Sequence, residues 1–242
     1  LIAVLGLVLY GTTAMLPLLM QNLLGYTAYN SGLALSPRGI GAFVTTIIVG
    51  RVAGRYVSNR VVISTGVVIL ATASFLLGGL DLSVPMSRLA WLSVVNGVGV
   101  SMMFVPLATS TMGRLSKEEM SNATGIFNLM RNLGGSAGIS ALTTIIARAT
   151  QAHQALLVHN IATTNPAYLQ QLSYLKGILI HQANPVLAAH RAEALIATDL
   201  GRQASILAYM GSFRMLAVLC IAVTPLVFFL KRPKGSRIAM AH

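Results

Sequence analysis

A few polar side chains set inside long apolar stretches are the residues of this 242-residue sequence that could do chemistry. Such a group inside a membrane needs a partner, a water-filled cavity or a path to the interface, because leaving it bare in hydrocarbon is costly. Arg38 follows Pro37, and no acidic residue is placed to neutralise it. We therefore expect Arg38 to face a polar cavity and to contact a bound compound there.

A second polar group lies at helical spacing further along the chain. Asn128 and Asn132 share one face at positions i and i+4, and Arg131 lies close to that face. Hydrogen bonding between helices and contact with a ligand are both open for these asparagines. Arg214, in the last apolar stretch, can extend its charged group to the interface, which favours a structural role.

Two more apolar stretches carry weaker polar signals. Tyr10 and Gln21 fall near one stripe of the first stretch, which suits the wall of a vestibule. Asn96 is followed by glycines and methionines, for which close helix packing is the alternative explanation. The spacings Gly97-x-x-x-Ser101 and Gly134-x-x-x-Gly138 also permit close helix crossing. The candidate binding residues are therefore Tyr10, Gln21, Arg38, Asn96, Asn128 and Arg131.

The sequence gives no support for an enzyme, a bound metal or a cofactor. It contains no phosphate-binding loop, nucleophile elbow or zinc-protease motif. Its five histidines lack a metal-ligand spacing, and its single cysteine, Cys220, lies in an apolar run. Every acidic residue falls in a predicted loop, so we expect no carboxylate inside the membrane to carry protons: these are Asp81, Glu118, Glu119, Glu193 and Asp199.

The elements that must position these residues are transmembrane helices. The chain is 55% hydrophobic and 9% charged, with a mean hydropathy of +0.74. About 20 apolar residues cross a bilayer as a helix, and Leu-, Ala- and Gly-rich runs without strict alternation favour helices over a β-barrel. Six spans are predicted, at residues 1–21, 32–54, 61–80, 89–113, 122–147 and 206–230.

The distribution of Lys and Arg predicts the orientation of these spans. Basic residues gather after the second, fourth and sixth spans. The net charge of +12 is spread along the chain and forms no separate basic domain that could bind nucleic acid. We expect both ends to be cytoplasmic, residues 148–205 to form an extracytoplasmic loop with short amphipathic helices, and residues 231–242 to form a basic cytoplasmic tail. Residues 1–147 would then hold the first five spans. That loop could be a solvated connector on the membrane surface or a docking surface for another protein.

Three stretches resemble the EmrB/QacA group of fourteen-helix drug:proton antiporters. They are residues 16–27 (LPLLMQNLLGYT), 31–39 (SGLALSPRG) and, most specifically, 122–138 (NATGIFNLMRNLGGSAG). The resemblance covers nearly the whole chain and corresponds to the last six spans of that group. Because the chain begins with Leu1 rather than Met, we also expect it to be a fragment.

The resemblance implies an all-α membrane protein of the major facilitator fold. The chain would form one six-helix half-bundle, with a long external loop before the last helix, and a missing N-terminal half would complete the transporter. It also implies contact with membrane lipid and, in Gram-negative members, a periplasmic adaptor and an outer-membrane channel as partners. One departure is Gly54, which stands where the superfamily's Gly-x-Leu-Ala-Asp-Arg-x-Gly gating motif has its acid, so acid-dependent gating is in doubt.

The resemblance implies that the complete protein carries out proton-coupled multidrug efflux across the cytoplasmic membrane, and we expect its cargo to be amphipathic compounds of aromatic or cationic character. An uncompensated arginine in the cavity wall would favour anionic or zwitterionic cargo, so the charge of the substrate stays open. An exporter of a siderophore, lipid or metabolite on the same fold is one alternative. A six-helix membrane scaffold without transport activity is the other.

Overall fold

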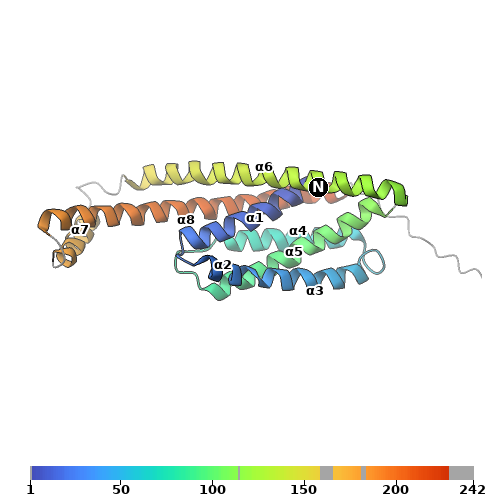
Figure 1. Cartoon of the computed structure of the whole chain (residues 1–242), viewed down its shortest axis with the longest axis horizontal. Coiled ribbons are helices and arrows are strands. Elements are labelled where there is room, and N and C mark those ends of the chain that lie inside the picture. The colour runs from blue at the N-terminus through green and yellow to red at the C-terminus, as the bar shows by residue number, and fades with distance from the viewer. Residues whose placement is uncertain (1, 114, 159–165, 181–183, 229–242) are drawn as a thin grey trace, which may run out of the picture.

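The computed structural model describes residues 2–113, 115–158, 166–180 and 184–228. Within these ranges every named element is an α-helix, which confirms the predicted fold class (Figure 1). The helices are α1 (Ile2–Asn22), α2 (Ala28–Leu35), α3 (Pro37–Val52), α4 (Asn59–Leu77), α5 (Met86–Met112), α6 (Lys117–Val158), α7 (Pro166–Leu179) and α8 (Pro185–Phe228).

The predicted second span consists of two helices, α2 and α3, with a break at Ser36 and Pro37. Proline lacks an N–H, so Pro37 cannot donate to the carbonyl of Leu33 four residues earlier. The Ser36 hydroxyl donates to that carbonyl instead, at 2.9 Å. The chain therefore continues across the break with the carbonyl satisfied, and Arg38 lies in the first turn of α3.

The helices pack in pairs around a shared core. Figure 1 shows α1 crossing between the long helices α6 and α8 and the group formed by α3, α4 and α5. α1 packs on α6, α5 packs on both α3 and α4, and α8 packs on α4 and α6. Fully buried side chains such as Leu19, Leu70 and Phe213 come from three different helices and meet in one hydrophobic cluster.

Glycines allow the closest of these crossings. A Cβ atom on Gly134 would strike the backbone of Ala3, and one on Gly138 would come within 2.7 Å of Leu7, so α1 and α6 touch through this face. On α5 a Cβ on Gly97 would strike the carbonyl of Arg38, while the Ser101 hydroxyl donates to the carbonyl of Ala42 at 3.1 Å. The structure thus confirms that both small-residue spacings lie at helix crossings.

Five helical segments are long and apolar enough to cross a membrane: Ile2–Asn22, Ala28–Val52, Asn59–Leu77, Met86–Met112 and Pro185–Val227. The predicted span at 122–147 lies in α6, which is not among the five because Ser, Thr, Asn and Gly residues dilute its apolar side chains. α6 nevertheless packs along α1 and α8 within the bundle.

The described parts of residues 148–205 belong to longer helices than the sequence predicts. α6 has 42 residues and α8 has 44, so they are roughly 63 and 66 Å long at about 1.5 Å per residue, about twice the hydrocarbon thickness. No proline or glycine interrupts residues 148–158, so α6 continues through them. Pro166 and Pro185 are instead the first residues of α7 and α8, a position that suits proline.

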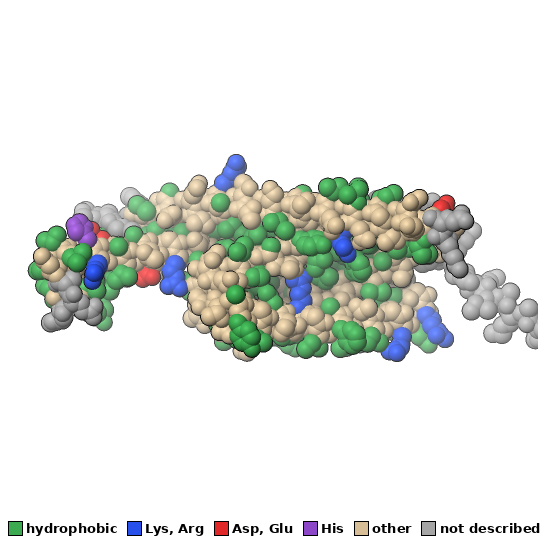
Figure 2. All heavy atoms as spheres, in the orientation of Figure 1, with side chains coloured by type: hydrophobic (Ala, Val, Ile, Leu, Met, Phe, Trp, Pro, Cys, Tyr) green, Lys and Arg blue, Asp and Glu red, His purple; other side chains and the backbone are tan. Residues whose placement is uncertain are grey.

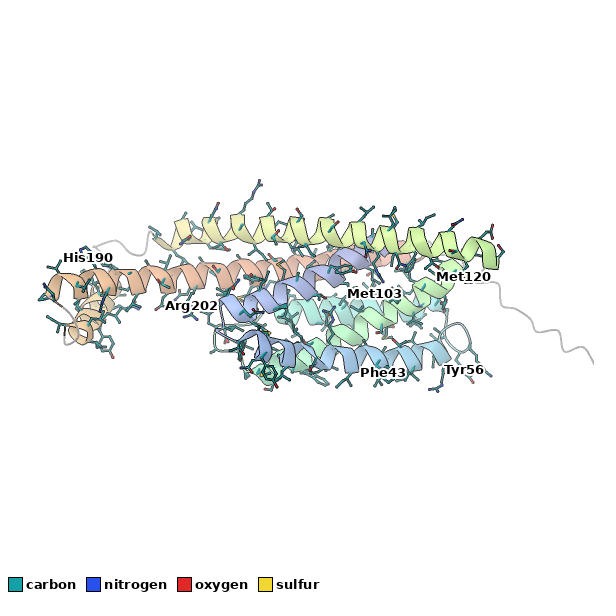
Figure 3. All side chains as sticks on the ribbon, in the orientation of Figure 1. Phe43, Tyr56, Met103, Met120, His190 and Arg202 are labelled. Carbon is teal, nitrogen blue, oxygen red and sulfur yellow. The ribbon has the colours of Figure 1, made fainter. Side chains whose placement is uncertain are left out.

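This part of the chain has its own small core. Leu172 of α7 packs with Ala192 and Ile196 of α8, and Tyr168, Leu175 and Leu179 lie around them. Figure 3 places His190 in the end of α8 that lies beside α7, far along the molecule from Met120. The predicted basic tail, 231–242, lies outside the described residues.

Candidate functional site

Arg38 lines a cavity of about 500 Å³ between α1, the α2–α3 break and α5. Its Nη1 atom donates to the Thr13 hydroxyl at 2.7 Å, and that hydroxyl donates in turn to the carbonyl of Leu9 at 2.6 Å. Its Nη2 atom is buried and has no hydrogen-bond partner among the described residues. A space-filling view shows a basic side chain in a recess of this face of the bundle (Figure 2).

The walls of this cavity are mainly apolar, where the sequence predicted a polar one. Thr13 and Ser36 are the polar neighbours of the guanidinium in the lining, and the other lining residues are Leu9, Leu35, Gly39, Ala42, Gly97 and Val100. Sequence reasoning missed Thr13, although it follows Tyr10 by three residues and so lies near the polar stripe of α1. No signal in the sequence pairs Thr13 with Arg38, because the pairing depends on which face of α1 meets the start of α3.

The other α1 candidates lie apart from Arg38. The Tyr10 hydroxyl donates to the Asn132 side-chain oxygen on α6 at 3.2 Å, so Tyr10 joins the α1–α6 crossing. Gln21 is exposed in the last turn of α1 and does not line the Arg38 cavity. The stripe that contains both residues therefore does not face a single cavity.

Asn96 lies in the packed interior of the bundle. Its side chain is 3% exposed, and neither atom of its amide has a hydrogen-bond partner among the described residues. Its neighbour Gly97 lines the Arg38 cavity, but Asn96 does not. A buried amide without a partner is destabilising, by about 1–3 kcal/mol in typical mutational data, which makes Asn96 an unusual residue for simple packing.

Arg131 lies beside two aromatic rings. Its guanidinium carbon is 5.8 Å from the ring centroid of Phe104, and that ring meets Phe127 edge to face at 5.9 Å. A cation over an aromatic face gains about 0.5–2 kcal/mol, depending on how far it is removed from water. Arg131 is thus held between α5 and α6. Asn128 is half-buried on α6; it is not part of this ring contact, and it does not line either of the two cavities described here.

Phe127 also borders a second cavity, of about 440 Å³, at the ends of α1, α5 and α6. Its walls are nearly all apolar and consist of Ile2, Leu107, Thr111, Ala123, Ile126, Phe127 and Met130. The structure therefore separates the six predicted residues. Arg38 lines one cavity, Arg131 contacts the aromatic pair that borders the other, and Tyr10, Gln21, Asn96 and Asn128 line neither.

Two arginines of α8 bind the ends of other helices. Arg214 donates from Nε to the carbonyl of Gly78 at 2.9 Å, which supports the structural role expected from its sequence position. Arg202, which sequence reasoning did not single out, donates from Nη2 to the carbonyl of Leu23 at 2.8 Å, and Figure 3 shows it where α8 passes the end of α1. Both cations lie at helix C-termini, where the helix dipole favours positive charge.

The turn after α3 contains Gly54, the residue that stands where the resemblance expects the acid of a gating motif. Gly54 has a φ of 79°, a conformation that favours glycine, and its N–H donates to the carbonyl of Val57 at 2.8 Å. The Arg55 guanidinium lies 5.5 Å from the ring centroid of Tyr56. Figure 3 shows Tyr56 beyond the end of α3, and Phe43 on the outer side of that helix.

Comparison with known proteins shows which family this chain matches and which proteins it is similar to. A family model described as the Major Facilitator Superfamily matches residues 1–139. The chain is 29% identical over 227 residues to the "Multidrug export protein EmrB" of Escherichia coli (strain K12), which covers 94% of this chain and 43% of that protein. It is 28% identical over 233 residues to a protein of the same name from Haemophilus influenzae, covering 96% of this chain and 44% of that protein.

A further relative carries a different description. The "Fatty acid resistance protein FarB" of Neisseria gonorrhoeae is 26% identical over 230 residues, covering 95% of this chain and 44% of its own length. The chain therefore spans less than half the length of the curated relatives that it matches.

Proposed function

Because the chain belongs to the Major Facilitator Superfamily, we propose that it forms the C-terminal half-bundle of a proton-coupled exporter of amphipathic compounds. The chain is a multi-pass membrane protein with five described segments that can span a bilayer. In this proposal α6, which packs along α1 and α8, provides the sixth span. The observation that carries the proposal is the cavity between α1, α3 and α5, which has a cation on one wall and apolar side chains on the others. Such a site suits a molecule with a polar end and an apolar body.

The proposal includes the orientation and the partner bundle. The protein lies in the cytoplasmic membrane, and both ends of the described chain face the cytoplasm. This orientation is the one that the basic loops favour. A second bundle faces the Arg38 cavity and alternates its access between the two sides. The described helices leave apolar side chains exposed on α3, such as Phe43 and Ile48, that lipid or the second bundle would cover.

The extension made by α7 and the beginning of α8 is the proposed site for an adaptor that leads to an outer-membrane channel. Large apolar side chains are exposed there, among them Tyr174 at 68% and Val186 at 66%. Replacing both with Ser should weaken export in cells that contain the adaptor, and leave export into the medium of spheroplasts unchanged. Export by this double variant that equals wild-type export in intact cells with the adaptor would contradict the docking role.

Export by the complete transporter tests the main proposal. A susceptible host that lacks its own pumps is given the transporter and a panel of anionic, cationic and neutral amphiphiles, and accumulation of each compound is measured. We expect lower accumulation of at least one class, abolished by a protonophore. Unchanged accumulation of the whole panel, with the protein present in the membrane, would favour the scaffold alternative.

A further inference from the structure

The Arg38 guanidinium is only half satisfied by the protein. One of its two terminal nitrogens, Nη1, is held by Thr13, whose hydroxyl already uses its proton on the carbonyl of Leu9. The other, Nη2, is buried and has no hydrogen-bond partner in the described ranges, although Arg38 as a residue lines the cavity. An unmatched charged donor in an apolar setting is strongly unfavourable, so the cavity is prepared to receive an acceptor.

The described chain offers no carboxylate for this role. Among the described residues Asp81, Glu193 and Asp199 lie outside the bundle's interior and are exposed, and the carboxylate of Glu119 accepts from Ser116. None of these four forms an ion pair with Arg38.

The rest of the cavity restricts the kind of anion. Leu9, Leu35 and Val100 give it apolar walls, and its volume of about 500 Å³ lies within the range of small-molecule sites. A multiply charged anion would lose more hydration in such a cavity than one guanidinium returns. A carboxylate is monoanionic, and its two oxygens match the planar donors of a guanidinium.

We propose that the Arg38 cavity binds the carboxylate of an amphiphilic anion, with Nη2 donating to the carboxylate and the apolar body lying against α1 and α5. This assignment rests on the proposed export function and names the charge class of its cargo. Thr13 acts as a positioning residue, because its hydroxyl holds the guanidinium at the cavity wall.

The test uses the complete transporter in lipid nanodiscs and three probes that share a ten-carbon chain: decanoate, decanamide and decyltrimethylammonium. Equilibrium dialysis gives the affinity for each probe. We expect Arg38→Gln to weaken decanoate binding about 10- to 100-fold, since a charge-assisted hydrogen bond is lost, and to leave decanamide within about 3-fold. Arg38→Lys should recover part of the decanoate affinity. Arg214→Gln, which alters an arginine bound to Gly78, is the matched control and should not discriminate between the probes.

A second pair of variants tests the cavity itself. Gly39 lines it and a Cβ there meets no atom within 4 Å, so Gly39→Leu should fill the space and lower decanoate affinity. Gly50 on the same helix is equally open but does not line the cavity, so Gly50→Leu should have no effect. This pair decides the question even if Arg38→Gln does not fold.

Each outcome bears on one proposal. Decanoate affinity that is unchanged in both Arg38→Gln and Gly39→Leu, or absent in the wild type, overturns the carboxylate site. Export of cationic or neutral compounds by the same transporter in cells would then leave the proposed function standing. Equal weakening of all three probes by Arg38→Gln shows a structural role for Arg38 and also overturns the inference.

Discussion

What an arginine does in this bundle depends on what its guanidinium meets. Arg214 donates to a helix-terminal carbonyl, Arg131 lies over an aromatic ring, and Arg38 keeps one nitrogen without a partner in the described chain. A charged side chain within a membrane is expensive unless it is paired or reaches water. Arg214 is compensated by the fold, whereas Arg131 is compensated only in part, because its Nε atom is also buried without a hydrogen-bond partner among the described residues. Arg38 differs from both in lining the cavity between α1, α3 and α5, which makes it the one of the three that is placed to meet a ligand.

Gly134 provides a test of the packing at residue scale. A Cβ there would strike the Ala3 backbone, so Gly134→Val should push α1 from α6 and destabilise the bundle by about 1–3 kcal/mol, as overpacking does. Gly125 is on the same helix, and a Cβ there would meet no atom within 4 Å, so Gly125→Val is the control. Thermal stability in detergent, measured by size-exclusion chromatography after heating, should fall for the first variant alone. Equal stability of the two would show that the crossing is not close.

At the scale of elements, the sequence predicted which segments are helices better than where they end. Apolar length alone locates α1, α4 and α5, because lipid demands about 20 apolar residues. The ends of α6 and α8 could not be predicted in this way, since α6 and α7 pack against α8 and this packing does not depend on an apolar run of membrane-spanning length.

The same limit applies to the candidate site. Arg38 was identifiable because a cation in an apolar stretch is rare, and its proline neighbour marks the break in the helix. Its partner Thr13 was not, because the sequence does not say which face of α1 meets α3. Tyr10 and Gln21 share a stripe in an ideal helix, yet the crossing with α6 takes Tyr10 away from the cavity.

The start of α6 provides an element-scale prediction with a pH dependence. Ser116 donates from its N–H and hydroxyl to the Glu119 carboxylate, each at 3.0 Å, and accepts from the Glu119 N–H at 3.3 Å. These hydrogen bonds, the backbone one first, lower the pKa of Glu119 from its ordinary value. The stabilisation is therefore complete above the ordinary glutamate pKa and is lost as the pH falls through the lower, folded value.

Hydrogen exchange of the amides at Ser116 and Glu119 measures this effect. We expect their protection to decline in acid in the wild type. In Glu119→Gln the decline should be much smaller, because glutamine also makes the reciprocal hydrogen bond but does not titrate. Identical acid profiles would show that the carboxylate does not hold the first turn.

The orientation of the elements gives a labelling prediction. Ser58, exposed before α4, should face the cytoplasm, and Gln170, exposed on α7, should face outside, as the basic-loop asymmetry requires. On a background without Cys220, a membrane-impermeant thiol reagent should label Gln170→Cys but not Ser58→Cys in intact cells. Labelling of Ser58→Cys under those conditions would reverse the topology. The sequence-based expectation that Ser236 is cytoplasmic falls outside the described residues.

At the scale of the whole molecule, the bundle and the extension have different chemistry. The described carboxylates lie in the α4–α5 loop, the first turn of α6 and the part of α8 before residue 206. Glu193 and Asp199 lie on α8, within the segment for which the sequence predicted short amphipathic helices and outside the predicted span at 206–230. The core of the bundle is apolar apart from a few buried hydroxyl and amide side chains.

This separation predicts where proton coupling resides. A proton antiporter needs an embedded group whose proton affinity differs between its inward-facing and outward-facing states, and carboxylates in a cavity are the usual form. His190, 74% exposed on the extension, would meet only one bulk solution. We therefore expect proton coupling to reside in the second bundle of the complete transporter. Replacing all five acids of this chain by amides should leave proton coupling present. The replacements are Asp81→Asn, Glu118→Gln, Glu119→Gln, Glu193→Gln and Asp199→Asn.

Cargo-induced proton release from the purified complete transporter measures the coupling directly. The amide variant should release protons within about 3-fold of the wild type, because none of the replaced carboxylates with a described side chain contacts the Arg38 cavity. Binding of decanamide, which carries no charge, serves as the control for folding. Loss of proton release with decanamide binding retained would place the coupling carboxylate in this chain. The five single replacements would then identify it, beginning with Glu193 and Asp199, because both lie on α8, the helix that continues into the bundle.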